Sequence, residues 1–183
     1  AYDNVIHDVA LQGLNVVMCL DRAGVVGEDG ATHQGAFDIA YMRSIPDLIV
    51  SAPMDGVELR NLMYTASLGR GPFVIRYPRG ASDTKQWQQS FREIPIGEAR
   101  WLREGTDVAV LTFGIVGIAA REAIERASQA GVDAAHVDLR FAKPLDRECL
   151  RKVADRFGRI IVIEDGVIDG GGGSAVLEFL REM

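Results

Sequence analysis

The sequence is poor in the residues that build metal and disulfide sites. Its 183 residues include two cysteines and three histidines. Cys19 and Cys149 lie too far apart for the short spacings of a zinc site or a redox pair, so we expect two buried, reduced thiols. His7, beside the apolar stripe of a predicted helix, and His136, within an apolar predicted strand, are interpreted as structural. Neither has a second histidine or cysteine at ligand spacing, so no zinc site is expected.

Long apolar runs and an excess of positive charge are also missing. No apolar run approaches the ~20 residues that a membrane helix needs, and the first residues lack the order of charge and hydrophobicity typical of a signal peptide. We therefore expect a cytoplasmic protein without membrane contact. With 20 basic and 26 acidic side chains the net charge is -6, which does not favour nucleic acid as a partner. An anionic ligand would have to meet local positive charge.

Strand-type and helix-type patterns alternate along the chain. Compact runs rich in apolar and β-branched residues predict strands at 14–20, 48–53, 72–78, 108–114, 132–139 and 159–165. The first of these suits a strand buried on both faces. Helical patterns occupy most of the intervening segments, 1–13 included, and the opening in a helix suggests that the chain begins upstream. Such alternation predicts an α/β fold of two successive parallel sheets.

A stretch from Arg79 to about Arg103 sustains neither the helical nor the strand period. It contains glycine, serine, threonine, glutamine, a proline and both tryptophans of the chain. We interpret 81–103 as a linker between one domain at 1–80 and a second at 104–183. The chain is long enough to bury two small cores.

The richest loop, DRAGVVGEDGATHQG at 21–35, follows the first predicted strand. It holds Arg22, Asp29 and His33 among four glycines. Ligands of open parallel sheets bind beyond the carboxyl ends of the strands, and long strand-to-helix loops are often functional. His33 is therefore a candidate for a chemical role. The alternatives are a solvated surface loop, or a histidine that caps the following helix.

Arginine also follows the strand at 72–78. Arg79 and Arg22 would lie on neighbouring loops at the same sheet edge, where two guanidinium groups could hold a dianionic substrate. Surface ion pairs, worth about 0–1 kcal/mol each, are the alternative reading of both residues.

A glycine run near the end of the chain imitates a nucleotide-binding motif. Gly170, Gly172 and Ala175 match G-x-G-x-x-A between a predicted strand and helix. A dinucleotide site also needs an acidic residue about 20 positions further on, after a second strand, and the sequence stops at Met183. We interpret the glycines as a tight turn that permits close helix packing.

Four segments together resemble the 1-deoxy-D-xylulose-5-phosphate synthase family. They are CLDRAGVVGEDGATHQGAFDIAYMRSIPDLIVSAPMD at 19–55, VIRYPRG at 74–80, DLRFAKPLD at 138–146 and VIEDGVIDGGGGSAVLEFL at 162–180. The resemblance covers essentially the whole chain. DRAG, GEDGxTHQG and YPRG at this spacing separate the family from other transketolase-like enzymes.

The resemblance implies most of a thiamine-pyrimidine-binding domain followed by a transketolase C-terminal-like domain of a homodimeric transferase. Its reaction would condense pyruvate with D-glyceraldehyde 3-phosphate with loss of CO2, using thiamine diphosphate and Mg2+, and would feed isoprenoid, thiamine and pyridoxal precursor synthesis. Arg22 and Arg79 would hold the aldehyde phosphate. His33 would donate a hydrogen bond or shuttle a proton beside the pyruvate-derived intermediate, and Asp29 would orient it.

The sequence departs from this family by omission. The glutamate that protonates the aminopyrimidine and the GDG-type motif that holds Mg2+ and diphosphate are expected upstream of residue 1, and EDG at 28–30 is not that motif. The resemblance therefore predicts a chain that needs the upstream region for activity and supplies no metal ligand. Two alternatives remain open: a β-type subunit of a thiamine-dependent 2-oxoacid dehydrogenase, and a noncatalytic assembly module of the same fold.

Overall fold

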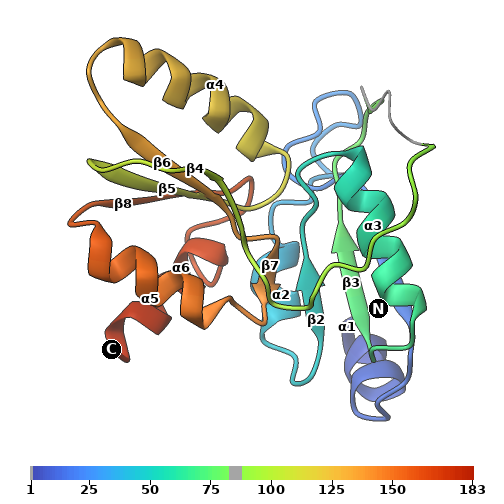
Figure 1. Ribbon diagram of the computed structural model, residues 1–183. Helices are drawn as coiled ribbons and strands as arrows, with labels where there is room; N and C mark the ends of the chain where they lie inside the picture. The colour runs from blue at the N-terminus through green and yellow to red at the C-terminus, as the bar shows by residue number, and fades with distance from the viewer. Residues whose placement is uncertain (1, 83–87) are drawn as a thin grey trace.

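The protein is an α/β molecule built around two four-stranded sheets (Figure 1). The structure, a computed structural model, describes residues 2–82 and 88–183. In the first sheet the order is β1 (Val17–Leu20), β3 (Phe73–Arg76), β2 (Ile49–Ser51) and β7 (Phe141–Lys143). In the second the order is β4 (Arg100–Arg103), β6 (Ala134–Asp138), β5 (Val108–Thr112) and β8 (Ile160–Ile163). The predicted α/β class is confirmed.

The helices fill the segments between strands. They are α1 (Tyr2–Asn4), the π-helix η1 (Val5–Ala10), α2 (Asp38–Arg43), α3 (Gly56–Ser67), α4 (Val116–Gln129), α5 (Arg147–Arg156) and α6 (Gly172–Arg181). α4 covers one face of the second sheet, and α5 and α6 cover the other (Figure 1). Asp55 caps α3 by accepting a hydrogen bond from the Glu58 amide at 2.9 Å. No helix in the described ranges is long and apolar enough to cross a membrane.

The strands that the sequence predicts pair in parallel, as expected, but each sheet also contains an antiparallel edge strand that was not predicted. β7 runs antiparallel to β2, and β4 runs antiparallel to β6. β7 follows β6 after two residues, but it leaves the second sheet and enters the first, where it pairs with β2. Residues 141–143 thus add a strand to the sheet formed by the first half of the chain, and β4 occupies the end of the expected linker.

The two sheets share one apolar core. A single cluster of buried side chains includes Val50 and Val74 of the first sheet and Leu111 and Val137 of the second. The burial predicted for β1 is wrong, because this strand lies at a sheet edge and leaves Val17 exposed. Cys19, on the same strand, is exposed as well, which corrects the prediction of a buried thiol.

The other cysteine behaves as expected. Cys149 on α5 is buried and free, and desolvation, followed by the charge of Asp146, raises the pKa of its thiol to about 11. This cysteine is therefore a protonated, unreactive core residue at neutral pH.

Candidate functional site

The loop at 21–36 leaves the carboxyl end of β1 and is closed at its base by backbone pairing. Gly24 and Gly35 exchange two hydrogen bonds, of 3.0 and 2.9 Å. Inside the loop, Gln34 donates to the carbonyls of Val26 and Gly30 and accepts from the Val26 amide. A Cβ atom at Gly35 would lie 2.1 Å from the Arg22 carbonyl oxygen, so the closure requires glycine. The candidate side chains Arg22, Asp29 and His33 therefore lie on a loop whose two ends are held together by hydrogen bonds.

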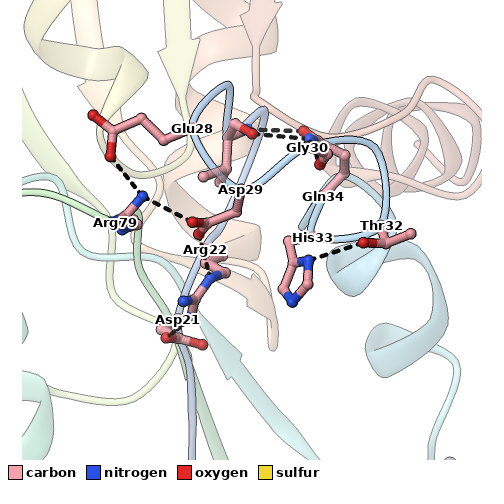
Figure 2. Close-up of polar contacts among 10 residues, drawn as sticks. Asp21, Arg22, Glu28, Asp29, Gly30, Thr32, His33, Gln34 and Arg79 are labelled. Carbon is pink, nitrogen blue, oxygen red and sulfur yellow. Dashed lines mark hydrogen bonds and ion pairs between the residues drawn. The ribbon is translucent and has the colours of Figure 1, made fainter.

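Asp29 brings together the two arginines that the sequence singled out. Its carboxylate accepts from Arg22 Nε at 2.6 Å and from Arg79 Nη1 at 2.9 Å (Figure 2). Arg22 also pairs with Asp21, and Arg79 pairs with Glu28 at 2.6 Å. The arginines meet because their loops follow the neighbouring strands β1 and β3, which pair in parallel.

The charges of this arginine pair are balanced by carboxylates. The hydrogen bond from Arg22, followed by the positive charge of Arg79, lowers the pKa of Asp29, although partial desolvation opposes the shift. Asp29 is consequently ionised at neutral pH. Its side chain is 19% exposed, whereas that of Glu28 is 83% exposed. Glu28 is thus the partner that an incoming anion can displace from Arg79.

His33 lies on the opposite side of Asp29 from Arg79 (Figure 2). The imidazole is exposed, and Nδ1 lies 3.0 Å from the Thr32 hydroxyl. In this structure the hydrogen bonds of Asp29 join it to the arginines and not to His33. The alternative of a helix cap is wrong, because α2 begins at Asp38 and its first turn has no side-chain cap. His33 remains available to a ligand.

Two cavities flank the segment that carries Arg79. One, of about 560 Å3, lies between 23–28 of the first loop and Pro78–Gly80. The other, of about 760 Å3, lies between the start of α3, residues 77–82 and the side chains of Ile115 and Ile118. Both halves of the chain line the larger cavity, so the site region lies where the two halves meet.

Sequence reasoning missed a buried ionic cluster beneath the loop. Arg76, the last residue of β3, pairs with Asp38 and Asp165, and its side chain is 2% exposed. The available signal was an arginine inside the apolar run PFVIRYP, since a cation in a buried strand requires counter-charges. A second such cluster, formed by Glu58, Arg100, Asp138 and Arg140, joins α3 to the second sheet.

The glycine run before α6 packs as the sequence predicts. A Cβ at Gly172 would lie 2.5 Å from the Phe113 ring. The amides of Gly172 and Gly173 donate to the Glu164 carboxylate at 2.9 and 2.8 Å. A carboxylate of the chain thus occupies the helix N-terminus at which a nucleotide phosphate would bind.

A diphosphate held by a metal ion would need carboxylate, histidine or cysteine ligands for the metal. Among residues 2–82 and 88–183, no group of histidine, cysteine, aspartate and glutamate side chains is arranged to hold a metal. The N-terminus of α6 is filled by Glu164.

Comparisons with known proteins match both halves of the chain. Residues 1–84 match the family model "Transketolase, pyrimidine binding domain", and residues 97–183 match "Transketolase, C-terminal domain". The 1-deoxy-D-xylulose-5-phosphate synthase of Bacteroides fragilis is 58% identical over 184 residues, 100% of this chain and 28% of the relative. That of Porphyromonas gingivalis is 52% identical over 99% of this chain and 29% of the relative. The chain therefore spans less than a third of these relatives.

A solved structure has the same fold. It is described as "Split gene transketolase, inactive beta4 tetramer" and aligns with a TM-score of 0.87 at 32% identity. The alignment covers 100% of this chain and 58% of the other.

Proposed function

The chain belongs to the 1-deoxy-D-xylulose-5-phosphate synthase family and corresponds to its C-terminal portion, and from this premise we propose that it carries the acceptor-binding part of such a synthase. The complete enzyme would join a two-carbon unit from pyruvate to D-glyceraldehyde 3-phosphate, with loss of CO2. The observation that carries the proposal is the carboxylate of Asp29 shared between Arg22 and Arg79. Two guanidinium groups converging from two loops suit a phosphate dianion.

Arg22 and Arg79 bind the aldehyde phosphate in this proposal. Guanidinium groups present planar pairs of donors that match phosphate oxygens, and they stay charged at any physiological pH. Glu28, at 83% side-chain exposure, leaves Arg79 when the phosphate arrives. Asp29, less exposed and bound to both arginines, keeps their spacing. The acceptor is thus held by its phosphate, with its carbonyl directed into the site.

His33 exchanges a hydrogen bond or a proton with the reacting oxygen. When the Thr32 hydroxyl donates to Nδ1, the neutral imidazole carries its proton on Nε2. Nε2 can then donate to a carbonyl or alkoxide oxygen of the substrate. Asp29 acts on this histidine through its negative charge, since its hydrogen bonds join it to the arginines.

The chain depends on a further region for turnover. Thiamine diphosphate and Mg2+ would be held mainly by parts of the complete homodimeric enzyme outside these residues. Two observations support this division. The chain spans 28% of the Bacteroides fragilis synthase, and a structure that it matches along its whole length is described as inactive. Isoprenoid, thiamine and pyridoxal precursor synthesis would consume the product.

A chimera tests the proposal. This chain replaces the matching segment of the Bacteroides fragilis synthase, and CO2 release from pyruvate is measured with thiamine diphosphate, Mg2+ and D-glyceraldehyde 3-phosphate. We expect activity in the chimera, none in the chain alone, and a large loss on His33→Ala. The parent synthase controls for the assay.

Other outcomes select the alternatives. A chimera that assembles with the parent's subunit composition but stays inactive would favour a noncatalytic module. Preference for lipoamide over the aldehyde phosphate would favour a β-type subunit of a 2-oxoacid dehydrogenase.

A further inference from the structure

Arg76 connects three segments that are distant in the sequence. Its Nε donates to Asp38 at 2.8 Å, its Nη1 to Asp165 at 2.5 Å and its Nη2 to the Gly35 carbonyl at 3.2 Å. The guanidinium side chain is 2% exposed, and the carboxylates of Asp38 and Asp165 are 6% and 14% exposed. All three guanidinium nitrogens thus have a protein acceptor, so the group is held in one orientation.

These partners control the base of the site loop. Gly35 is the residue at which the loop closes on Gly24, and Asp38 is the first residue of α2, into which the loop leads. Asp165 follows β8 in the second sheet. It is therefore the one member of the cluster supplied by the C-terminal half of the chain.

Asp165 also touches the loop directly. A Cβ atom at Gly24 would lie 2.7 Å from Asp165 Oδ2. Gly24 has a φ of +77°, so glycine is favoured there by the backbone as well as by the contact. The carboxylate of Asp165 thus lies close to Gly24 at the loop base while it accepts a hydrogen bond from Arg76.

Charge balance indicates that Asp165 does more than stabilise the core. Asp38 alone neutralises Arg76, and burying a second carboxylate beside the pair adds desolvation without a second cation. The ion pair of Arg76 with Asp38 would by itself be enough to bury Arg76 without net charge. What the second carboxylate adds is a fixed position of the loop relative to the C-terminal half.

We propose that Asp165 is a positioning residue: through Arg76 and Gly24 it sets the loop that presents Arg22, Asp29 and His33. The C-terminal half thereby takes part in organising the site as well as in assembly. The consequence for catalysis rests on the synthase function proposed above, whereas the consequence for the loop does not.

Hydrogen exchange of the full 183-residue chain tests the effect on the loop. Asp165→Asn keeps the shape and one acceptor oxygen but removes the charge, and Asp169→Asn, at an exposed position in the same connection between β8 and α6, is the matched control. We expect exchange of the amides at 22–35 to rise about tenfold or more in Asp165→Asn and not in Asp169→Asn. Asp165→Glu, which restores the charge, should give a smaller rise. Equal exchange in Asp165→Asn and Asp169→Asn would overturn the proposal.

Steady-state kinetics of the chimera test how Asp165 affects binding of the acceptor substrate. Asp165→Asn should raise the KM for D-glyceraldehyde 3-phosphate about tenfold, with a smaller change in kcat, and should change the KM for unphosphorylated D-glyceraldehyde much less. An equal loss with both acceptors would mark a purely structural role and overturn the proposal. An inactive wild-type chimera whose loop still loosens in Asp165→Asn would refute the synthase function and leave the positioning role standing.

Discussion

At the scale of single residues, Glu28 would compete with the phosphate of the proposed acceptor for Arg79. Their ion pair is 2.6 Å long, yet both side chains are largely exposed, at 44% and 83%. Exposed pairs contribute about 0–1 kcal/mol, whereas a hydrogen bond to a charged ligand group contributes about 1.5–3 kcal/mol. Binding of a phosphate dianion should therefore displace Glu28 at little cost.

This competition gives a prediction for the chimeric enzyme. Arg79→Ala should raise the KM for D-glyceraldehyde 3-phosphate roughly 10- to 150-fold, the equivalent of about 1.5–3 kcal/mol. Arg79→Lys should recover only part of this, because an ammonium lacks the planar pair of donors. Glu28→Gln should leave that KM unchanged or lower it, since it frees Arg79. Steady-state kinetics at varied concentrations of D-glyceraldehyde 3-phosphate give these KM values. A raised KM in Glu28→Gln would contradict the displacement of Glu28 from Arg79 by the phosphate.

The convergence of Arg22 and Arg79 could be predicted from the sequence, because both follow adjacent parallel strands and strand ends share a sheet edge. The pairing of Asp29 with both arginines could not. It depends on the path of the loop at 21–36, which is set by contacts within the loop such as those of Gln34 with the carbonyls of Val26 and Gly30. The buried ion pairs of Arg76 were not predicted, because its partners Asp38 and Asp165 lie 38 and 89 positions away in the sequence.

At the scale of elements, α6 packs against the second sheet through a glycine that allows close approach. Gly172 faces the Phe113 ring, where a Cβ would lie at 2.5 Å. At the next residue, Gly173, a Cβ would meet its nearest atom, Glu164 Oε1, at 3.4 Å. Neither glycine has a positive φ. The two positions thus share a helix turn and differ in the space around them.

Alanine substitutions at Gly172 and Gly173 should therefore differ in their effect on the free energy of unfolding. Gly172→Ala should lower the free energy of unfolding by about 1–3 kcal/mol, because the added methyl overpacks the core at an aromatic ring. Gly173→Ala should change it by less than about 1 kcal/mol in either direction, since alanine favours helix. Urea unfolding of both variants of the chain measures the difference. Equal destabilisation would show that the Phe113 contact relaxes without strain.

Element types were predictable where hydrophobic periodicity was strong, as in β5, α4 and β6. Strand direction was not predictable at β7. Its sequence, FAK at 141–143, is short, and its pairing with β2 depends on a partner about 90 positions earlier. β1 was given a buried role from its composition, but an edge position in a sheet is a tertiary property that composition does not encode.

At the scale of the whole molecule, the second ionic cluster joins the two halves. Glu58 on α3 pairs with Arg140 at 2.9 Å, and Arg100 pairs with Asp138 at 3.1 Å. The Asp138 side chain is fully buried. Desolvation, followed by repulsion from Glu58, raises the pKa of this carboxyl to about 6, although Arg100 and Arg140 oppose the shift.

Because of the raised pKa, the contribution of Asp138 to the free energy of unfolding depends on pH. A carboxyl whose pKa is higher in the folded state stabilises the fold fully below its unfolded pKa, because the folded state binds the proton more tightly. That contribution is lost as the pH rises from about 4 to about 6, the window between the ordinary pKa of an aspartate and the raised pKa of Asp138 in the folded protein. A shift of this size corresponds to at most about 3 kcal/mol.

Asp138→Asn should therefore remove the decrease in the free energy of unfolding that the titration of Asp138 causes between pH 4 and pH 6. The amide stays neutral at every pH, so the free energy of unfolding of the variant relative to the parent should rise between pH 4 and pH 6 and stay constant above about pH 7. Urea unfolding of the chain at half-unit pH steps gives this difference, in which the titration of carboxylates that do not contact the cluster cancels. Glu148→Gln, at an exposed position on α5, controls for the loss of one surface carboxylate. A difference that is flat across this window would mean that Asp138 is already ionised in the folded protein at pH 4, with Arg100 and Arg140 outweighing its burial.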